Sequence, residues 1–177
     1  AIERAGQSGW QFLKINGDPR QAAMAGVGLV NHNANANVVF GSPAILATID
    51  RLDIQFNSVS WIADIKYNSF SIAKRIGRLG SFAISYVNMD YGDIPETIHA
   101  ESQGSTTVPN ITGNYFTAND IAIGFSYAKK ITDYLSLGGN IKYISEKIAG
   151  TGMSNWAIDF STLYYTGLNS LRLSIIA

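Results

Sequence analysis

The residue types that most often carry catalysis or bind metal ions are scarce in this chain. Its 177 residues include no cysteine and only two histidines, His32 and His99. Without cysteine, thiolate nucleophiles, disulfides and zinc–thiolate sites are excluded. Neither histidine has a second histidine or a carboxylate at a metal-ligand spacing, so both are interpreted as loop or plug residues. We therefore expect no metal site.

The glycine motifs of common enzymes are not matched either. The stretch 124–128 comes nearest to a Gly-x-Ser-x-Gly nucleophile elbow, but it lies in a predicted strand that no helix follows, and Ser126 is interpreted as a small interior residue. Gly26 and Gly28 lack the third glycine and the strand–helix setting of a dinucleotide-binding motif. We expect no catalytic residue, no cofactor and no enzymatic activity.

Several polar residues instead fall on the polar faces of alternating segments, where a closed barrel would place them in its interior: Asp64, Lys66, Asn140, Lys142, Asp159 and Arg172. They could line a polar transport path, or charges of both signs could pair inside a filled barrel. The second interpretation is favoured. Over the whole chain 13 basic and 13 acidic residues cancel, so no overall field attracts nucleic acid, which we do not expect as a partner.

Apolar residues recur at every second position from about Leu52 onward, which is the period of a strand whose two faces meet different environments. The clearest example is the segment 135–143. The alternation predicts seven antiparallel strands, at about 51–61, 64–75, 80–90, 119–130, 134–147, 154–166 and 170–177. Strands of about 11 residues match the roughly 9 to 11 tilted residues that cross a bilayer. The pattern therefore predicts an all-β antiparallel transmembrane β-barrel in a bacterial outer membrane, in contact with lipid.

The connections between these strands alternate in length. Short turns at 76–79, 131–133 and 167–169 alternate with longer links at 91–118 and 148–153, as in outer-membrane barrels, although the link near 62–63 is also short. Cations gather near the tight-turn edge, where they reach water or phosphate head groups: Lys74, Arg75, Arg78, Lys129 and Lys130. Aromatic residues near strand ends suit an interfacial girdle: Trp61, Tyr91, Tyr134, Trp156, Tyr164 and Tyr165.

The first 50 residues have a different pattern, in which the run 31–37 interrupts any period. Prolines break helices here, although 20–25 could form one helical turn and 38–40 could be extended. We predict an N-terminal plug or cap over 1–50 and barrel strands over 51–177. Because the alternation runs on to Ala177 and single-chain bacterial barrels have even strand counts, the barrel is expected to be truncated at the C-terminus. A closed eight-stranded barrel that uses 38–40 is the alternative.

A series of short motifs runs through the chain in a fixed order. They are Gly9–Ile15, Pro19–Gly26, Ser42–Ala44, Trp61–Ile65, Tyr91–Ile94, Ser126–Lys130, Leu135–Lys142 and Ala157–Tyr164. In order and spacing they resemble the PorV/PorQ family of outer-membrane proteins over essentially the whole chain. The N-terminal part of this resemblance rests on Phe12, Leu13, Arg20, Met24, Gly26, Pro43 and Ala44. The chain departs from the family at Ala25, where glycine is usual, and at Ser42, where asparagine is usual.

The resemblance implies a FadL-like barrel of about fourteen strands, of which this chain would be the first half, with the N-terminal segment near the lumen. Members accompany the translocon of the type IX secretion system of Bacteroidetes. A non-enzymatic role in protein secretion is therefore implied, with a translocon subunit or an exported cargo protein as partner. One alternative is a FadL-like transporter of hydrophobic molecules, with a dry pocket lined by Trp10, Phe12, Leu13 and Met24. Another is a soluble β-sandwich or surface adhesin whose apolar faces meet each other.

Overall fold

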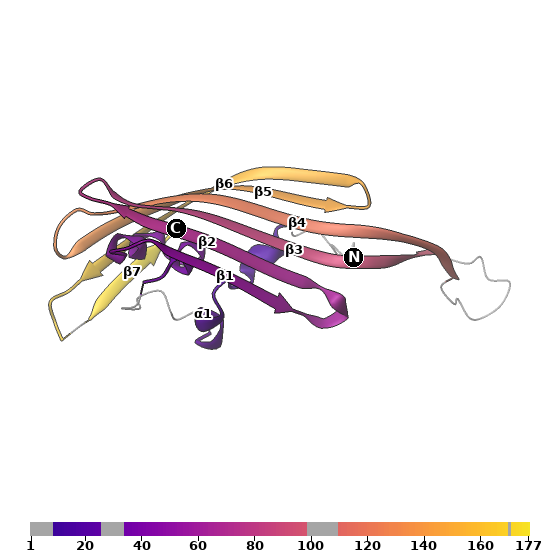
Figure 1. The fold of residues 1–177 in the computed structure, drawn as a ribbon, viewed down its shortest axis with the longest axis horizontal. Coiled ribbons are helices and arrows are strands. Elements are labelled where there is room, and N and C mark those ends of the chain that lie inside the picture. The colour runs from indigo at the N-terminus through magenta and orange to yellow at the C-terminus, as the bar shows by residue number, and fades with distance from the viewer. Residues whose placement is uncertain (1–8, 26–33, 99–109, 170) are drawn as a thin grey trace, which may run out of the picture.

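The sheet is a single antiparallel meander that curls around the N-terminal segment (Figure 1). The computed structural model describes residues 9–25, 34–98, 110–169 and 171–177. Every strand pairs with its neighbours in sequence, which leaves β1 and β7 at the two edges. The strands are β1 (Asp53–Ser60), β2 (Lys66–Ile76), β3 (Gly80–Ile98), β4 (Asn110–Lys130), β5 (Leu135–Ile148), β6 (Thr151–Tyr165) and β7 (Arg172–Ile176). The predicted antiparallel all-β sheet of seven strands is thus confirmed as a curled half-barrel.

Two of the predicted loops are wrong. Most of the described part of the link 91–118 continues β3 and β4 as a paired hairpin, in which Thr97 is opposite Ile111. Register shifts between Asp90 and Asp93 and between Pro95 and Thr97 interrupt the alternation that the sequence pattern relied on. The link 148–153 is a tight turn, because Ala149 and Gly150 both have positive φ, at 48° and 82°. Two such residues suit the twist of a hairpin.

The N-terminal segment forms short helical turns, not strands. They are η1 (Gln11–Lys14), α1 (Pro19–Ala23), η3 (Ala36–Phe40) and η4 (Pro43–Thr48), followed after β1 by η5 (Ile62–Asp64). In α1 the proline is at the first position and the Asp18 carboxylate accepts a hydrogen bond from the Arg20 amide at 3.0 Å, which is a favourable N-terminal cap. No helix among the described residues is long and apolar enough to span a membrane.

The predicted extended conformation at 38–40 is wrong, and with it the eight-stranded barrel that would have used this segment. Val38 and Val39 lie in η3 and are buried under the sheet, at 4% and 2% exposed. A new strand would have to pair with an edge strand of the sheet. These residues instead pack on the concave face, where they make apolar contacts. Figure 1 shows these helical turns lying against one side of the sheet.

The core lies between the N-terminal segment and the concave face of the sheet. One part packs Val38, Val39, Ile45 and Leu46 against small or apolar strand residues, which are Ala73, Ala83, Ala128 and Leu163. A second part surrounds Phe12 with Tyr67, Val87, Met89, Ala122 and Ile144. The concave face is therefore the buried face, and the alternation of each strand directs the other set of side chains outward.

Candidate functional site

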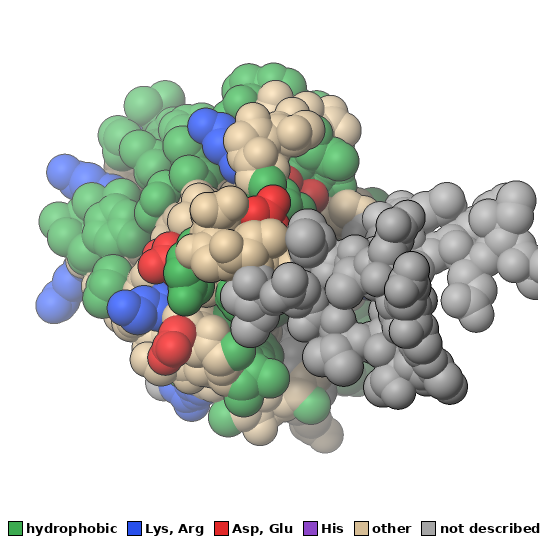
Figure 2. Space-filling view, turned by 90° about the vertical axis from the view of Figure 1, so that its right-hand side faces the viewer, with side chains coloured by type: hydrophobic (Ala, Val, Ile, Leu, Met, Phe, Trp, Pro, Cys, Tyr) green, Lys and Arg blue, Asp and Glu red, His purple; other side chains and the backbone are tan. Residues whose placement is uncertain are grey.

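The convex face of the sheet carries large apolar side chains in continuous cross-strand rows. One row runs through Ile54, Ile72, Ile84, Phe125, Ile141 and Ile158, and the next through Phe56, Phe70, Tyr86, Ile123, Tyr143 and Trp156. Many of these side chains are exposed, including Phe56 at 68% and Trp156 at 66%. Figure 2 shows hydrophobic side chains gathered over the left and upper outer surface. We call these two rows, together with Phe82, Tyr127, Leu135, Leu137, Phe160, Tyr164, Leu173 and Ile175, the apolar belt.

Polar residues border the apolar belt along the strands. On one side the next row is Ser58, Asn68, Asn88, Ile121, Ser145 and Ser154, and the row after it contains Lys66, Asp90, Asn119 and Lys147. At the other side, near the tight turns, Lys74 and Lys129 share the convex face. Along β5 the belt runs from Leu135 to Tyr143, which is roughly 26 Å of strand. At a tilt of about 40° this spans about 20 Å, close to the apolar band of about 25 Å on membrane barrels.

The concave face holds the N-terminal segment through hydrogen bonds from short polar side chains. The backbone carbonyl of Gly17 accepts from Ser69 Oγ at 2.8 Å and from Asn57 Nδ2 at 3.1 Å. The side-chain oxygen of Asn37 accepts from Ser71 Oγ at 2.9 Å and again from Asn57 at 3.3 Å. Because Ser69, Ser71 and Asn37 are buried, these bonds satisfy polar atoms that water does not reach.

A glycine allows the closest approach between the segment and the sheet. A Cβ atom added at Gly138 of β5 would lie 2.5 Å from the carbonyl carbon of Pro43 and closer still to the amide nitrogen of Ala44. That amide donates a buried hydrogen bond of 2.7 Å to Ser161 Oγ on β6. The Pro43 and Ala44 pair from the predicted family motif therefore lies directly on the sheet, and the sheet has no side chain at that point.

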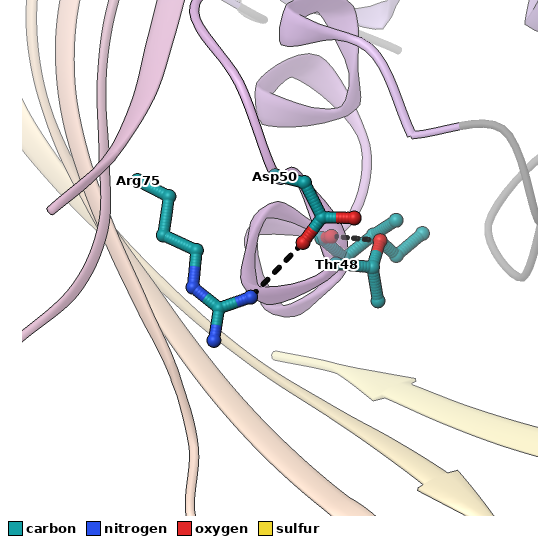
Figure 3. Close-up of polar contacts among 4 residues, drawn as sticks. Thr48, Asp50 and Arg75 are labelled. Atoms are coloured by element: carbon teal, nitrogen blue, oxygen red, sulfur yellow. Dashed lines mark hydrogen bonds and ion pairs between the residues drawn. The ribbon is translucent and has the colours of Figure 1, made fainter. Parts of the chain in front are cut away.

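The two ends of the segment are also tied to the strands. After η4, the Arg75 guanidinium of β2 donates to the Asp50 carboxylate at 3.0 Å, and Thr48 Oγ1 donates to the Ile45 carbonyl at 2.7 Å (Figure 3). Near the start of η1, the Trp10 amide donates to Glu146 Oε1 of β5 at 2.5 Å. The exposed pair of Arg75 and Asp50 adds little stability by itself, so the buried contacts hold the segment.

Three of the predicted interior polar residues come together on the concave face. Lys142 Nζ lies 2.6 Å from Asp159 Oδ2, and Asn140 Nδ2 donates to the same oxygen at 3.3 Å. The strands β5 and β6 place them there through their antiparallel register. Arg172 also has its side chain on the concave side, with its guanidinium carbon 4.9 Å from the centre of the Tyr165 ring. These groups are half-buried or buried, and the charges of Lys142 and Asp159 are paired with each other.

The predicted interior position of Lys66 is wrong, because Lys66 has the same orientation as Phe70 and Ile72 on the convex face. Asp64 is exposed in η5, outside the strands. The convex face is apolar only within the belt. Lys66 lies beyond the border of the belt, where an outward-facing residue can be charged. A polar residue therefore does not identify the inner face at the end of a strand.

The N-terminal motif residues separate into buried and exposed groups. Phe12, Pro43 and Ala44 are buried and Leu13 packs against the Phe12 cluster, whereas Arg20 and Met24 are exposed. Gly26, like His32 and His99, lies outside the described residues. Of the four residues that the transporter alternative places around a dry pocket, Trp10 and Leu13 pack against Phe12, whereas Met24 is not part of this cluster.

The cavity found next to this cluster is small and partly polar. Its volume is about 40 Å³, and Leu13, Ser85, Asn140 and Lys142 are among its lining residues. Such a space holds about one to three water molecules. This particular cavity is too small for a hydrophobic molecule of appreciable size.

Sequence reasoning singled out Ser126 as a small interior residue, which is confirmed by its 0% exposure, but it missed the other small residues of the concave face, although the sequence carries a signal for them. Serine, alanine and glycine recur at every second position opposite the large apolar residues, as in 69–73, 81–85 and 122–128. A face made of small side chains leaves room for another segment to approach the backbone closely. The N-terminal segment takes that room.

Beyond the apolar belt, the extended β3–β4 hairpin is ordered by its own polar contacts. The Glu96 carboxylate accepts from Thr112 Oγ1 at 2.9 Å and from Asn114 Nδ2 at 3.1 Å. The hydrogen bond from Asn114, followed by that from Thr112, holds the pKa of Glu96 below its ordinary value. The hairpin projects past the ends of the other strands in Figure 1.

Within the described residues, no group of three histidine, aspartate or glutamate side chains is placed to hold a metal ion. Comparisons with protein families, with curated proteins and with solved structures found no match to this chain.

Proposed function

We propose that this chain forms part of a β-barrel in a bacterial outer membrane, with the apolar belt facing lipid. The observation that carries the proposal is the belt itself: the large apolar side chains are on the exposed face, while the small ones are buried under the N-terminal segment. Leaving a single Phe or Ile side chain in water forgoes roughly 1.5–3 kcal/mol. A surface of this size in contact with water would be strongly unfavourable, whereas lipid stabilises it.

The edges of the sheet extend this proposal. The outer edges of β1 and β7 carry backbone groups that the described strands leave unpaired. In a bilayer each such group costs several kcal/mol, so only a closed barrel is stable there. Further strands must therefore continue the sheet in the membrane, in agreement with the FadL-like barrel that the family resemblance implies.

We propose further that the role is non-enzymatic and belongs to protein secretion, with a translocon subunit or an exported protein as the partner. Two features support a role in binding a protein, and not a role in passing molecules through this part of the barrel. The N-terminal segment covers much of the concave face, and the cavity beside the Phe12 cluster is about 40 Å³. The β3–β4 hairpin, held by Glu96 and its partners, provides an ordered surface beyond the belt.

The alternatives receive less support. A transporter of hydrophobic molecules requires a dry pocket near Phe12 and Leu13, and the cavity beside them is small and includes Lys142 and Asn140 in its lining. A soluble sandwich requires a second sheet over the apolar belt, and the described strands all belong to one sheet whose other face is already covered.

Photo-crosslinking in the native host tests the secretion role. A benzophenone amino acid is placed at Thr97 on the hairpin, and a matched control carries it at Asp133 in the turn between β4 and β5. The proposal predicts crosslinks from Thr97 to a translocon subunit or to exported proteins, and none from Asp133. Co-purified hydrophobic molecules without a protein crosslink would instead support the transporter.

A further inference from the structure

A groove lies on the concave face at the end of β1. Its volume is about 360 Å³, and it is bounded by the end of β1 on one side and by the N-terminal segment between Lys14 and Ala22 on the other. Most of its lining side chains are apolar: Ile15, Pro19, Ala22, Val59 and Trp61. Val59 has the same orientation as Asn57, which donates a hydrogen bond to the N-terminal segment. The groove is therefore a largely apolar space between the sheet and this segment.

The exposed surface of α1 continues from this groove. Pro19 and Ala22 line the groove, and Ala23 and Met24 beside them are exposed as well. In Figure 1, α1 lies outside the edge that β1 forms and not behind the other strands. The described strands therefore leave this largely apolar surface uncovered.

The free edge of β1 indicates what kind of structure covers the groove. Among the described strands β1 pairs only with β2, so the backbone groups on its outer side have no strand to bond with. Another extended strand satisfies such groups along the whole edge, and a helix or a small molecule does not. Side chains alternate along a strand. The residue that pairs with Val59 would therefore point its side chain to the concave face, where the groove lies.

The lining of the groove determines the chemistry of that side chain. Among Ile15, Pro19 and Val59, a polar side chain would lose its hydrogen bonds to water without gaining others. An apolar side chain loses nothing there and fills the space. If the strand shifted by one residue, this side chain would turn to the convex face and its neighbour would enter the groove instead.

We propose that the groove receives an apolar side chain from one further strand of the same polypeptide, which pairs with β1 in the complete barrel. The N-terminal segment then selects the register in which the barrel closes at β1. This inference rests on the proposed function, because only a closed barrel in the membrane requires that strand.

Maleimide labelling of single cysteines tests whether the groove is filled. Ala22→Cys places a thiol in the groove, and Ala23→Cys is the matched control because Ala23 is exposed but does not line the groove. In outer membranes isolated from the native host, a water-soluble maleimide should label Ala22→Cys at least about tenfold more slowly than Ala23→Cys, since the first thiol reacts only when the strand opens locally. After unfolding in urea the two rates should be equal. Equal rates in the folded protein would overturn the inference.

A photo-crosslinker identifies what fills the groove. A benzophenone amino acid replaces Trp61, an aromatic residue of the groove, and a matched control carries it at Trp156 on the convex face. Tandem mass spectrometry should find position 61, and not position 156, joined to a strand of the same polypeptide beyond the seven described, in a product of monomer mass.

The other outcomes of these experiments are decisive as well. Attachment of position 61 only to residues within 1–177, to a second copy or to a different protein would overturn the inference alone, as would the absence of any crosslink. If the full-length protein did not fractionate with the outer membrane, the proposed function would fail and the inference with it.

Discussion

The contact between Gly138 and the N-terminal segment gives a sharp prediction. In Gly138→Ala, the new methyl group would meet the carbonyl carbon of Pro43 at 2.5 Å, whereas carbon atoms pack at about 3.5–4.0 Å. The obstacle is backbone and not the end of a flexible side chain, so the segment must move by about 1 Å or leave the sheet. The chain cannot relax this contact by changing a rotamer.

The cost follows from two effects. Overpacking of this kind costs roughly 1–3 kcal/mol. Moving Ala44 also breaks its buried hydrogen bond to Ser161, which is worth about 1 kcal/mol. We therefore expect Gly138→Ala to lower the free energy of unfolding by roughly 2–4 kcal/mol.

The neighbouring glycine is the matched control. In Gly139→Ala the methyl group points to the open convex face and meets no atom closer than 3.6 Å, so stability should stay the same or rise by roughly 0.5–1 kcal/mol. Urea unfolding in detergent micelles, followed by tryptophan fluorescence, measures both variants. Trypsin cleavage after the exposed Arg20 should accelerate in Gly138→Ala alone. Equal stability of the two variants would refute the proposed close contact.

Three further outcomes follow from the same structure. A lysine at Ile123, in the apolar belt, should destabilise the membrane-inserted protein by roughly 2–4 kcal/mol, while Asn88→Lys on the polar border should cost about 0–1 kcal/mol; equal costs in vesicle unfolding experiments would place the belt elsewhere. Asn37→Ala removes the acceptor of the Ser71 and Asn57 hydrogen bonds and should lower the free energy of unfolding by roughly 1–3 kcal/mol, whereas Lys14→Ala, at an exposed position of the same segment, should have little effect by the same urea assay. Because the pKa of Glu96 is lowered in the folded hairpin, its stabilising contribution is present above the ordinary carboxylate pKa and is lost as the pH falls through the lowered value. The protection factors of the Thr112 and Asn114 amides, which compare the measured exchange rate with the intrinsic rate at the same pH, should therefore fall at acid pH in the wild type, and Glu96→Gln should abolish this fall.

The strands were predictable because large apolar residues alternate regularly with small or polar residues along each of them. In 135–143 every outward position except Gly139 is large and apolar, so alternation fixes both the element and the orientation of its faces. The prediction fails where that rule stops. At the β3–β4 hairpin, Gly92 and Pro95 accompany shifts in register, so paired strands look like a loop in sequence.

The interior was less predictable because small side chains leave a weak signal. No sequence motif marks the residues that determine where the N-terminal segment binds, among them Ser69, Ser71 and Gly138. Lys66 shows the opposite error, because it lies on the polar face of the predicted strand and yet faces outward in the structure. The position of the segment depends on contacts between residues far apart in the chain, and no local pattern encodes those.

Spin labelling of the convex face tests the central claim most directly. Because the chain has no cysteine, single cysteines can be introduced at Ile84 and Ile158 in the belt and at Ser58 on its polar border without removing any native thiol. In lipid vesicles, labels at Ile84 and Ile158 should collide with dissolved oxygen and not with a water-soluble nickel reagent, and the label at Ser58 should do the reverse. Access of the nickel reagent to the labels at Ile84 and Ile158 would contradict the proposal that the apolar belt faces lipid.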